Sequence, residues 1–454
     1  MMSLDIRRRL FKIFEGKKIV LLGIGRSNLA IAEILSSFGI SFAVCDVRET
    51  VNLSSLKGAN YSSHLGKNYL DYLECDLILR SPGFPFTEPA LLNAKKNGTE
   101  VTSEIEIFFD LAPCKIIGIT GSDGKTTTST VIYEILRRSI QNVFLGGNIG
   151  QPLISRLFEI DETSIAIAEL SSFQLISMKK SPDIAIITNI SQNHLDVHKD
   201  FEEYVNSKSN ILRFQNEDSF AILNFDDPLT TRFKKMTAGK TIFFSTLLKK
   251  NIYLENGTIY VNEIPALNID QIKIPGIHNV KNFMAALGAV FACGKFEIGN
   301  IKFAAKEFSG VEHRIEFVRE INGVKFFNDS VASSPNRTLN GALSVFNENI
   351  ILIAGGYDKK LSYSEFAKVV CCRVKILILM GNTSKRIRAE VENLKTKNKL
   401  LMIDVKNMKE AVLTAKKFAD NGDVVILSPA SASFDLYKNF EERGIHFKKI
   451  VNKL

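Results

Sequence analysis

The sequence lacks the features that mark several protein classes. No apolar run reaches the roughly 18 residues that suggest a membrane-spanning helix, so we expect no membrane span. The basic N-terminal stretch, residues 1–18, has neither a continuous apolar core nor a small-residue cleavage site. We therefore expect it to belong to the folded protein and not to a secretion signal. Short-period repeats and low-complexity segments are also missing.

Cysteines are few, and the charged residues are not clustered. The six cysteines match no zinc-binding spacing, and a reducing, cytoplasmic location is the simplest interpretation. The net charge is +9, from 58 basic and 49 acidic residues, and the lysines are scattered along the chain. Nucleic-acid binding would need a clustered basic face with interleaved aromatic residues, so we expect no nucleic acid partner. The modest positive charge suits small anionic substrates.

Three segments share one design, an apolar run that leads into a glycine loop; they are 17–27, 115–126 and 348–360. Continuous apolar strands are typical of buried parallel sheets, in which ligands bind at the carboxyl ends of the strands. At about 150 residues per domain, 454 residues suggest about three domains. We therefore predict an α/β protein in which a central P-loop ATPase-type domain lies between two Rossmann-like domains. The predicted boundaries are 1–110, 111–310 and 311–454.

The stretch GITGSDGKTT, 118–127, resembles a phosphate-binding loop but departs from the usual spacing. That pattern places a Gly five positions before the Gly of Gly-Lys-Ser/Thr, and Ile119 stands there instead. An apolar strand pattern precedes the loop and a helical pattern follows it, which is the structural context of a phosphate loop. The context therefore favours a phosphate loop of a different kind over a chance match.

The residue types in this loop suit a nucleotide. Gly121 and Gly124 allow backbone conformations that turn N–H groups inward, and a helix N-terminus adds partial positive charge. Lys125 would reach the outer phosphates, and Thr126 or Thr127 would hold Mg²⁺. The loop alone therefore predicts binding of a nucleoside triphosphate with its metal.

Two further polar residues follow apolar strands of the same segment. Glu169 ends the strand pattern at 165–169, where a carboxylate can face a metal, and His194 lies in a polar loop after the next strand. A helical pattern then carries Lys208, fourteen residues after His194. Together with the phosphate loop these residues predict a metal–phosphate site, although Mg²⁺ is bound less typically by His than by oxygen ligands.

His194 and His198 are also spaced as in zinc proteases. That motif needs Glu directly after the first His and a helix beneath the pair, whereas Leu195 follows here and the pair lies in a loop. We therefore disfavour a zinc protease and interpret His198 as a loop residue, not a ligand.

Several motifs occur in the order that is typical of one family. They are TGSDGKT at 120–126, GGNIGQPL at 146–153, IAIAELSSFQL at 165–175 and SPASASFDLYKNFEERG at 428–444. On these motifs the chain resembles the Mur ligase family over nearly its whole length, and most of all its D-glutamate-adding members. The resemblance implies an ATP-dependent carbon–nitrogen ligase that joins D-glutamate to UDP-N-acetylmuramoyl-L-alanine through an acyl phosphate. Such an enzyme would serve peptidoglycan synthesis, and through it cell shape and division, as a cytoplasmic monomer.

The resemblance also implies roles for residues of the central segment. The nucleotide would be held by the loop residues Gly121, Ser122, Asp123, Gly124, Lys125, Thr126 and Thr127. Two Mg²⁺ ions would be held by Thr126, Glu169, His194 and Lys208, the last through a carbamate formed with CO₂. Lys125, Glu169, His194 and Lys208 would be the catalytic residues. Asn282 would contact adenine.

The outer segments would bind the other substrates. The UDP-sugar would contact Ser27, Asp46, Arg48, Gly83 and Asn148. In the last domain Arg314 would meet the nucleotide, and Asp329 would accept hydrogen bonds from ribose. The incoming glutamate would contact Ser333, Lys359, Ser433 and Phe440, because a dianionic amino acid needs a cation and hydroxyl or N–H donors.

Two departures from the family pattern and three alternatives remain. Val331 stands where many members have Lys, and Asp123 replaces the more usual Asn of the phosphate loop.

The segment GIGRSN, 23–28, together with Asp46, is similar to a dinucleotide-binding fingerprint, except that Asn28 replaces its third Gly. A nicotinamide oxidoreductase is therefore one alternative. The others are a sibling ligase that adds another amino acid or glutamylates folate, and a non-catalytic nucleotide-binding protein.

Overall fold

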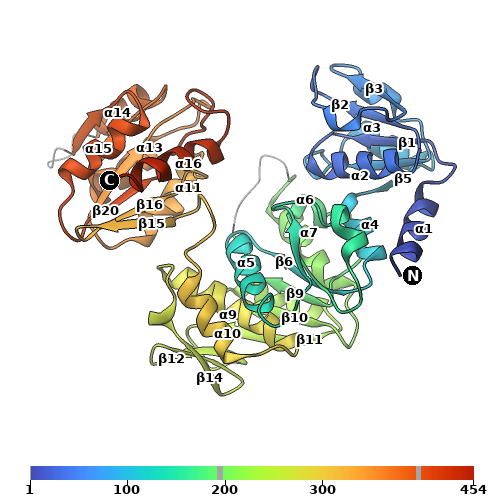
Figure 1. Cartoon of the computed structure of the whole chain (residues 1–454), viewed down its shortest axis with the longest axis horizontal. Coiled ribbons are helices and arrows are strands. Elements are labelled where there is room, and N and C mark those ends of the chain that lie inside the picture. Colours follow the sequence, from blue (N-terminus) through green and yellow to red (C-terminus); the bar gives the residue numbers. More distant parts are fainter. Residues whose placement is uncertain (1, 192–197, 395–399) are drawn as a thin grey trace. The chain divides into compact units, whose positions relative to one another are not determined.

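The computed structural model describes residues 2–191, 198–394 and 400–454 and forms two compact units. The first unit comprises Met1–Gln271 and His278–Ala305, and the second comprises Ile272–Ile277 and Lys306–Leu454. Three β-sheets with helices between their strands are found in the described residues, which confirms the predicted α/β class (Figure 1).

The first sheet is parallel throughout and has the strand order β3-β2-β1-β4-β5. Its strands are β1 (Ile19–Leu22), β2 (Phe42–Asp46), β3 (Tyr61–Leu65), β4 (Leu77–Arg80) and β5 (Glu100–Thr102). The helices of this segment are α1 (Met2–Phe14), α2 (Arg26–Ser37), α3 (Pro89–Lys96) and α4 (Glu104–Leu111). All four residues of β1, IVLL, are buried, as expected for a central strand with both faces covered.

The second sheet has the order β14-β13-β12-β11-β10-β9-β6-β8-β7. It is parallel from β7 to β12, and β13 and β14 continue it antiparallel. Its strands are β6 (Lys115–Thr120), β7 (Val143–Gly147), β8 (Ile165–Glu169), β9 (Ile184–Ile187), β10 (Phe220–Asn224), β11 (Lys240–Ser245), β12 (Ile252–Glu255), β13 (Thr258–Val261) and β14 (Ile264–Asn268). The helices of this part are α5 (Lys125–Leu136), α6 (Ser172–Leu175), α7 (Phe201–Arg213), α8 (Pro228–Arg232), α9 (Ile277–Ala292) and α10 (Ile298–Glu307).

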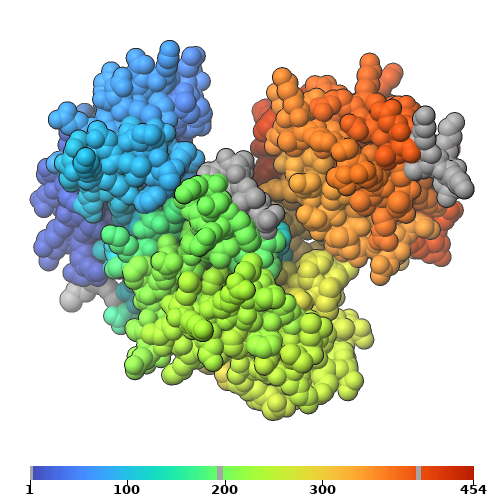
Figure 2. Space-filling model, turned by 180° about the vertical axis from the view of Figure 1, so that it is seen from behind, coloured from blue at the N-terminus to red at the C-terminus, as the bar shows by residue number. Residues whose placement is uncertain are grey.

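The first two sheets share one hydrophobic core. That core includes Leu21 and Leu35 beside the first sheet, Phe108 of α4, and Ala168 of β8 in the second sheet. In the space-filling view blue residues of the N-terminal segment lie against green residues from later in the same unit (Figure 2). A hydrogen bond crosses the same contact: the Ile154 N–H donates to the Glu104 carboxylate over 3.2 Å. The phosphate loop and the N-terminal loops are therefore held on one packed body.

The third sheet has the order β15-β16-β20-β17-β18-β19, and only the β15–β16 pair is antiparallel. Its strands are β15 (Glu316–Ile321), β16 (Val324–Asn328), β17 (Ile350–Ala354), β18 (Val374–Leu379), β19 (Leu401–Asp404) and β20 (Val424–Leu427). The helices are α11 (Pro335–Asn340), α12 (Ala342–Val345), α13 (Ser364–Arg373), α14 (Ser384–Asn393), α15 (Met408–Phe418) and α16 (Phe440–Val451).

Alternate residues of β17 show how this sheet is covered on both faces. Leu352 packs in a cluster with Phe366 of α13, whereas Ile353 packs in another cluster with Val412 of α15 and Phe447 of α16. This burial on both faces explains why the strand IILIA is apolar at every position.

The three strands predicted to lead into glycine loops are present as β1, β6 and β17. The boundaries at 110/111 and 310/311 stay predictions, although each sheet lies inside one predicted domain. Among the helices of the described residues, none is both long enough and apolar enough to cross a membrane.

Candidate functional site

The predicted phosphate loop lies between β6 and α5, and its glycines are needed for close approach. Gly121 has φ +150° and Gly124 has φ +81°, both in the region that favours glycine. A Cβ on Gly121 would collide with the Thr188 hydroxyl, and one on Gly124 would collide with the Asn282 side chain. Lys125 is the first residue of α5, so the loop leads directly into a helix N-terminus.

Residues that follow β9 fix the shape of this loop. Thr188 donates to the Asp123 carbonyl over 2.6 Å, and the Asp123 N–H donates to the Asn189 side chain over 3.0 Å. The Ser122 hydroxyl lies 2.9 Å from the Tyr204 hydroxyl and accepts from the Ser191 N–H over 2.8 Å. Sequence reasoning missed these supporting residues, because single Thr, Asn and Tyr side chains carry no motif. The Ser122 side chain thus supports the loop.

Two lysines converge on one carbonyl of the loop. Lys125 donates to the carbonyls of Gly121 and Ser122 over 2.9 and 3.0 Å, and Lys208 donates to the Gly121 carbonyl over 2.8 Å. Lys208 is 2% exposed, and its ammonium lies 4.7 Å from the Tyr204 ring centre. Burial and the charge of Lys125 hold the pKa of the Lys208 amine well below its usual value. The loop therefore combines one cation, Lys125, with a buried amine whose charged form is disfavoured.

Glu169 ends β8, as predicted, and one of its carboxylate oxygens has no hydrogen-bond partner among the described residues. Oε1 accepts from the Asn148 side-chain amide over 3.1 Å, while Oε2 is buried without a hydrogen-bond partner. A buried carboxylate oxygen of this kind is costly unless a cation or a donor reaches it. The unpartnered Glu169 oxygen, an anionic oxygen ligand, therefore fits a bound Mg²⁺.

The other predicted metal ligands are not tested by the structure. His194 lies outside the described residues. Within the described residues no three His, Cys, Asp or Glu side chains gather into a metal-binding group. His198 is buried, with Nε2 2.9 Å from the Ser172 hydroxyl and Nδ1 3.3 Å from Glu203, and its ring stacks on Phe173. These contacts give His198 a structural position, in line with its interpretation as a loop residue.

Helix α9 brings Asn282 to the phosphate loop. The Asn282 side chain accepts from the Thr128 hydroxyl over 3.4 Å and donates to Asn279 over 3.2 Å. The helix is fixed next to the sheet by an ion pair of 2.9 Å between Lys281 and Asp226. Asn282 therefore lies beside the loop, and its predicted contact with adenine stays a prediction.

A cavity of about 200 Å³ joins loops of the first and second sheets. It is lined by Arg26, Ser27, Ser81, Pro82, Gly83, Gly147, Asn148, Gly150, Pro152 and Gln174. Three of the five residues predicted for the UDP-sugar, Ser27, Gly83 and Asn148, thus line one cavity. Asn148 also donates to Glu169, which connects this cavity to the phosphate-loop region.

The other two residues predicted for the UDP-sugar pair with each other at the end of β2. Arg48 donates to both oxygens of Asp46 over 2.8 and 2.7 Å, and Asp46 also accepts from the Ile24 N–H over 2.8 Å. Burial favours the neutral Asp46 carboxyl, but the hydrogen bonds and the charge of Arg48 outweigh it and lower the Asp46 pKa to about 2. Asp46 and Arg48 do not line the cavity, and a role near uracil stays a prediction.

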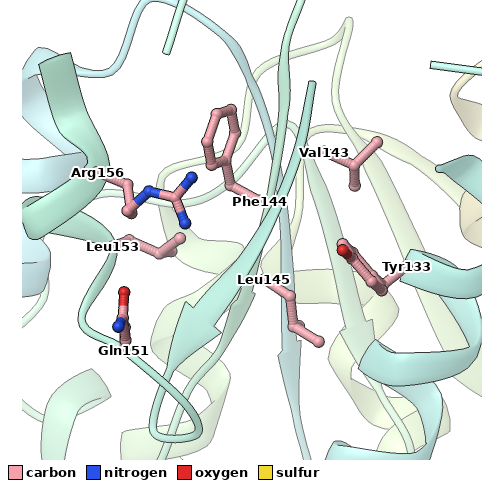
Figure 3. Close-up of a pocket in the computed structure, with 7 residues that line it drawn as sticks. All are labelled: Tyr133, Val143, Phe144, Leu145, Gln151, Leu153 and Arg156. Carbon is pink, nitrogen blue, oxygen red and sulfur yellow. The ribbon is translucent and has the colours of Figure 1, made fainter. Parts of the chain in front are cut away.

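A second cavity, of about 220 Å³, lies at the edge strand β7. Figure 3 shows Arg156, Leu153 and Gln151 on the side opposite Tyr133. Arg156 pairs with Glu159 over 2.7 Å, and its guanidinium lies 5.1 Å from the Phe144 ring centre. None of the predicted site residues lines this cavity, so it is separate from the phosphate loop.

In the second unit Asp329 follows β16 and is fully enclosed. It accepts from the Ser428 hydroxyl over 2.6 Å and from the Ile315 N–H over 3.3 Å. Burial raises the Asp329 pKa to about 7, although the Ser428 hydrogen bond and the nearby charge of Arg314 oppose the shift. Asp329 and Arg314 are therefore within electrostatic range of each other, and their contacts with a nucleotide stay predictions.

The residues predicted to hold glutamate come from three neighbouring strand ends. Ser333 follows β16, Lys359 follows β17 and Ser433 follows β20, and these strands are adjacent and parallel in the third sheet. Phe440 begins α16, and its carbonyl accepts from the Ser330 hydroxyl over 2.8 Å. Lys359 is exposed, whereas Ser433 is 3% exposed. The fold thus gathers residues that are 100 positions apart at one sheet edge, the edge at which ligands bind in such folds.

Comparison with known proteins places these regions in one family. Three family profiles match: the Mur ligase MurD-like N-terminal domain over 17–103, the Mur ligase middle domain over 119–290, and the Mur ligase glutamate ligase domain over 313–431. Among curated relatives, the UDP-N-acetylmuramoylalanine–D-glutamate ligase of Acetivibrio thermocellus is 46% identical over 98% of each chain. The protein of the same name from Clostridium tetani is 42% identical, also over 98% of each chain.

Solved structures share the fold at lower identity. UDP-N-acetylmuramate–alanine ligase from Thermotoga maritima has a TM-score of 0.59 and 20% identity, covering 96% of this chain and 99% of its own. MurF ligase from Thermotoga maritima, solved with ADP, has a TM-score of 0.56 and 17% identity, covering 97% of this chain and 96% of its own. The resemblance carried by the sequence motifs is confirmed, since the profiles follow one another along the chain and the curated relatives span it. The chain belongs to the Mur ligase family of ATP-dependent, amide-bond-forming enzymes.

Proposed function

We propose that this chain is the ligase that adds D-glutamate to UDP-N-acetylmuramoyl-L-alanine during peptidoglycan precursor synthesis. The observation that carries the proposal is the convergence of Lys125 and Lys208 on the Gly121 carbonyl, in a chain whose curated relatives bear that activity in their names. Lys125 would supply positive charge to phosphate oxygens at this loop, and Lys208 brings a buried amine, on which a carbamate could form, to the same carbonyl.

ATP would bind on the loop from Gly121 to Thr127. Backbone N–H groups at the start of α5 would face the phosphates, and Lys125 would move from the loop carbonyls to the γ-phosphate. The alanine carboxylate of the UDP-sugar would then attack the γ-phosphorus, so that an acyl phosphate forms and ADP leaves. The amine of D-glutamate would attack the acyl carbon, lose a proton and expel phosphate. Lys125 would stabilise charge on the transferring phosphoryl group, which is usually a large contribution in such chemistry.

Two Mg²⁺ ions would be held near the loop by Thr126, Glu169, His194 and Lys208. When bound, Mg²⁺ supplies electrostatic stabilisation of phosphate oxygens. The buried Oε2 of Glu169, which has no hydrogen-bond partner in the described part of the chain, supports the proposal that a cation binds at this position. A carbamate on Lys208 would replace this buried amine by an anion within electrostatic range of Glu169. Such an anion would suit a metal pair.

The two acceptor substrates would bind in different units. The UDP-sugar would lie along the cavity lined by Ser27, Gly83 and Asn148, with Asp46 and Arg48 near uracil. D-Glutamate would be held by Ser333, Lys359 and Ser433 with Phe440 beside them, and Asp329 with Arg314 would contact the nucleotide. Because ATP and UDP-sugars are cytoplasmic metabolites, we propose a cytoplasmic enzyme, acting as a monomer.

Phosphate release from ATP tests this function. The purified protein is incubated with Mg²⁺, UDP-N-acetylmuramoyl-L-alanine and a panel of amino acids that contains D-glutamate, L-glutamate, L-alanine and L-lysine. Release with D-glutamate alone is the expected result. Release with another amino acid would keep the ligase and overturn the assignment of Lys359 and Ser433. No release with any of them would contradict a catalytic role for the phosphate loop.

A further inference from the structure

Arg443 of α16 is the most completely enclosed cation of the second unit's strand-end region. The side chain is 2% exposed, and no motif assigned it a role. Its guanidinium donates four hydrogen bonds: Nε to the Ser330 hydroxyl over 3.0 Å, Nη2 to the Ser330 carbonyl over 2.8 Å, and Nη1 to the carbonyls of Ser431 and Ala432 over 3.2 and 3.0 Å. A planar fork with this many fixed donors is a property of arginine that lysine lacks.

The acceptors of Arg443 lie on the loops that carry the predicted glutamate residues. Ser330 precedes Ser333 on the loop after β16, and Ala432 directly precedes Ser433 on the loop after β20. The same Ala432 carbonyl also accepts from the Tyr357 N–H over 2.9 Å, and Tyr357 lies two residues before Lys359. The guanidinium therefore joins two of the loops directly, and the third is joined to them through the Ala432 carbonyl that Arg443 and Tyr357 share.

The charge of Arg443 is also not neutralised by a close partner. In the described residues no carboxylate lies within 4.0 Å of its guanidinium, and Asp435 and Asp329 act on it only at longer range. Its four hydrogen-bond acceptors are neutral carbonyls and a hydroxyl. A buried positive charge in low-dielectric surroundings attracts an anion at the neighbouring surface more strongly than an exposed one does.

We propose that Arg443 is the positioning residue for the amino-acid substrate: it fixes the loops of Ser333, Lys359 and Ser433 relative to one another and makes their surface attractive to a dianion. The inference rests on the proposed function, because it takes the amino acid to be D-glutamate. Arg443 contacts no substrate itself, so its effect is exerted through the three loops.

Steady-state kinetics of Arg443→Lys tests the inference. The lysine keeps the charge but cannot hold Ser330 and Ala432 together, so the KM for D-glutamate is expected to rise about ten- to a hundredfold. The KM for UDP-N-acetylmuramoyl-L-alanine is expected to stay unchanged. The KM for ATP is expected to change much less, because Asp329 is held independently by Ser428 and Ile315. Arg319→Lys is the matched control, since Arg319 is an exposed arginine of the same unit that also donates to a backbone carbonyl.

Two further measurements separate positioning from mere stability. Ser330→Ala removes one acceptor of Arg443, together with the hydrogen bond to the Phe440 carbonyl, with little loss of volume, and a severalfold rise in the KM for D-glutamate is expected even if Arg443→Lys does not fold. In Arg443→Ala, millimolar guanidinium is expected to restore part of kcat/KM for D-glutamate. An unchanged KM for D-glutamate in Ser330→Ala and in folded Arg443→Lys, or an equal rise for all three substrates, would overturn the inference. Failure of the wild-type protein to use D-glutamate would instead refute the proposed function.

Discussion

The strand ends of the second sheet and of the third sheet use basic side chains in opposite ways. At the second sheet, Lys125 and Lys208 point into the phosphate loop and meet at the carbonyl of Gly121. At the third sheet, Arg443 lies behind the loops and binds their backbone. The first arrangement presents charge directly to a ligand, whereas the second uses charge to shape the surface that a ligand meets. Direct contacts are expected to be the more sensitive to substitution.

Lys208→Ala is expected to have the largest effect on activity. The substitution removes a buried amine from the Gly121 carbonyl, where Lys125 is the other described lysine that donates. Turnover should therefore fall by about a thousandfold. Phosphate release with all three substrates measures it. Short-chain carboxylic acids should partly restore activity if a carbamate is the working form of Lys208. Lys199→Ala, an exposed lysine just before the same helix, is the control, and full activity of Lys208→Ala would remove Lys208 from the mechanism.

The aspartates at the strand ends provide the next contrast. Asp329 has a pKa raised to about 7, above the value near 3.8 of an unfolded aspartate, so the folded state binds its proton more tightly than the unfolded state. The free energy of unfolding should therefore fall as the pH rises from about 4 to about 7, by about 3–4 kcal/mol, and then level off. Asp329→Asn should remove that decline, and calorimetry of both proteins at pH 5 and pH 8 measures it.

Parallel pH dependences in the two proteins would show that Asp329 does not titrate in this range. The transition to follow is the one that Asp329→Asn alters, because a protein of two compact units need not unfold in one step. Ser428→Ala gives an independent check: it removes the hydrogen bond that favours the ionised form of Asp329, so the decline in stability should continue to a higher pH than in the wild-type protein.

The phosphate loop offers a smaller effect that depends on shape. In Gly121→Ala the added Cβ would collide with the Thr188 hydroxyl at a φ of +150°, which displaces the loop that Lys125 and Lys208 share. We expect the KM for ATP to rise by about ten- to a hundredfold, from roughly 1–3 kcal/mol of strain and lost contacts. Gly16→Ala is the control, because its φ of +73° also lies in the region that favours glycine but nothing in the described residues lies within 4 Å of the added Cβ. Similar ATP affinities in the two variants would contradict a role for this close approach.

The difference between the two regions also explains what the sequence could predict. The strands β1, β6 and β17, the loop at 121–127 and Glu169 at the end of β8 could be read from apolar runs and short motifs, because their signals are contiguous. Arg443, Tyr204 and Thr188 could not, since each acts through loops far away in the chain. The pairing of Asp46 with Arg48 was also not foreseen, because the two residues were assigned to a ligand and not to each other.

The smallest expected effect concerns Asp46, with the opposite sign to that of Asp329. The pKa of Asp46 is lowered to about 2 in the folded protein, so its ionised form adds stability above the unfolded pKa near 3.8 and that stability is lost as the pH falls towards 2. Asp46→Asn should therefore destabilise the first unit by about 1–2 kcal/mol at pH 7 and by almost nothing near pH 2. The effect at pH 7 is modest because Arg48 is half exposed, so solvent screens its attraction to Asp46.

Urea unfolding of wild type and Asp46→Asn at pH 7, and at the lowest pH at which both remain folded, measures this difference. Arg48→Lys keeps the charge but loses the two-point contact with Asp46, so it should cost less than Asp46→Asn. If the loss of unfolding free energy in Asp46→Asn were independent of pH, Asp46 would stabilise the fold through packing and neutral hydrogen bonds and not through its charge. The two aspartates would then no longer differ in how their regions use ionisation, and only the cations would distinguish the strand ends of the two units.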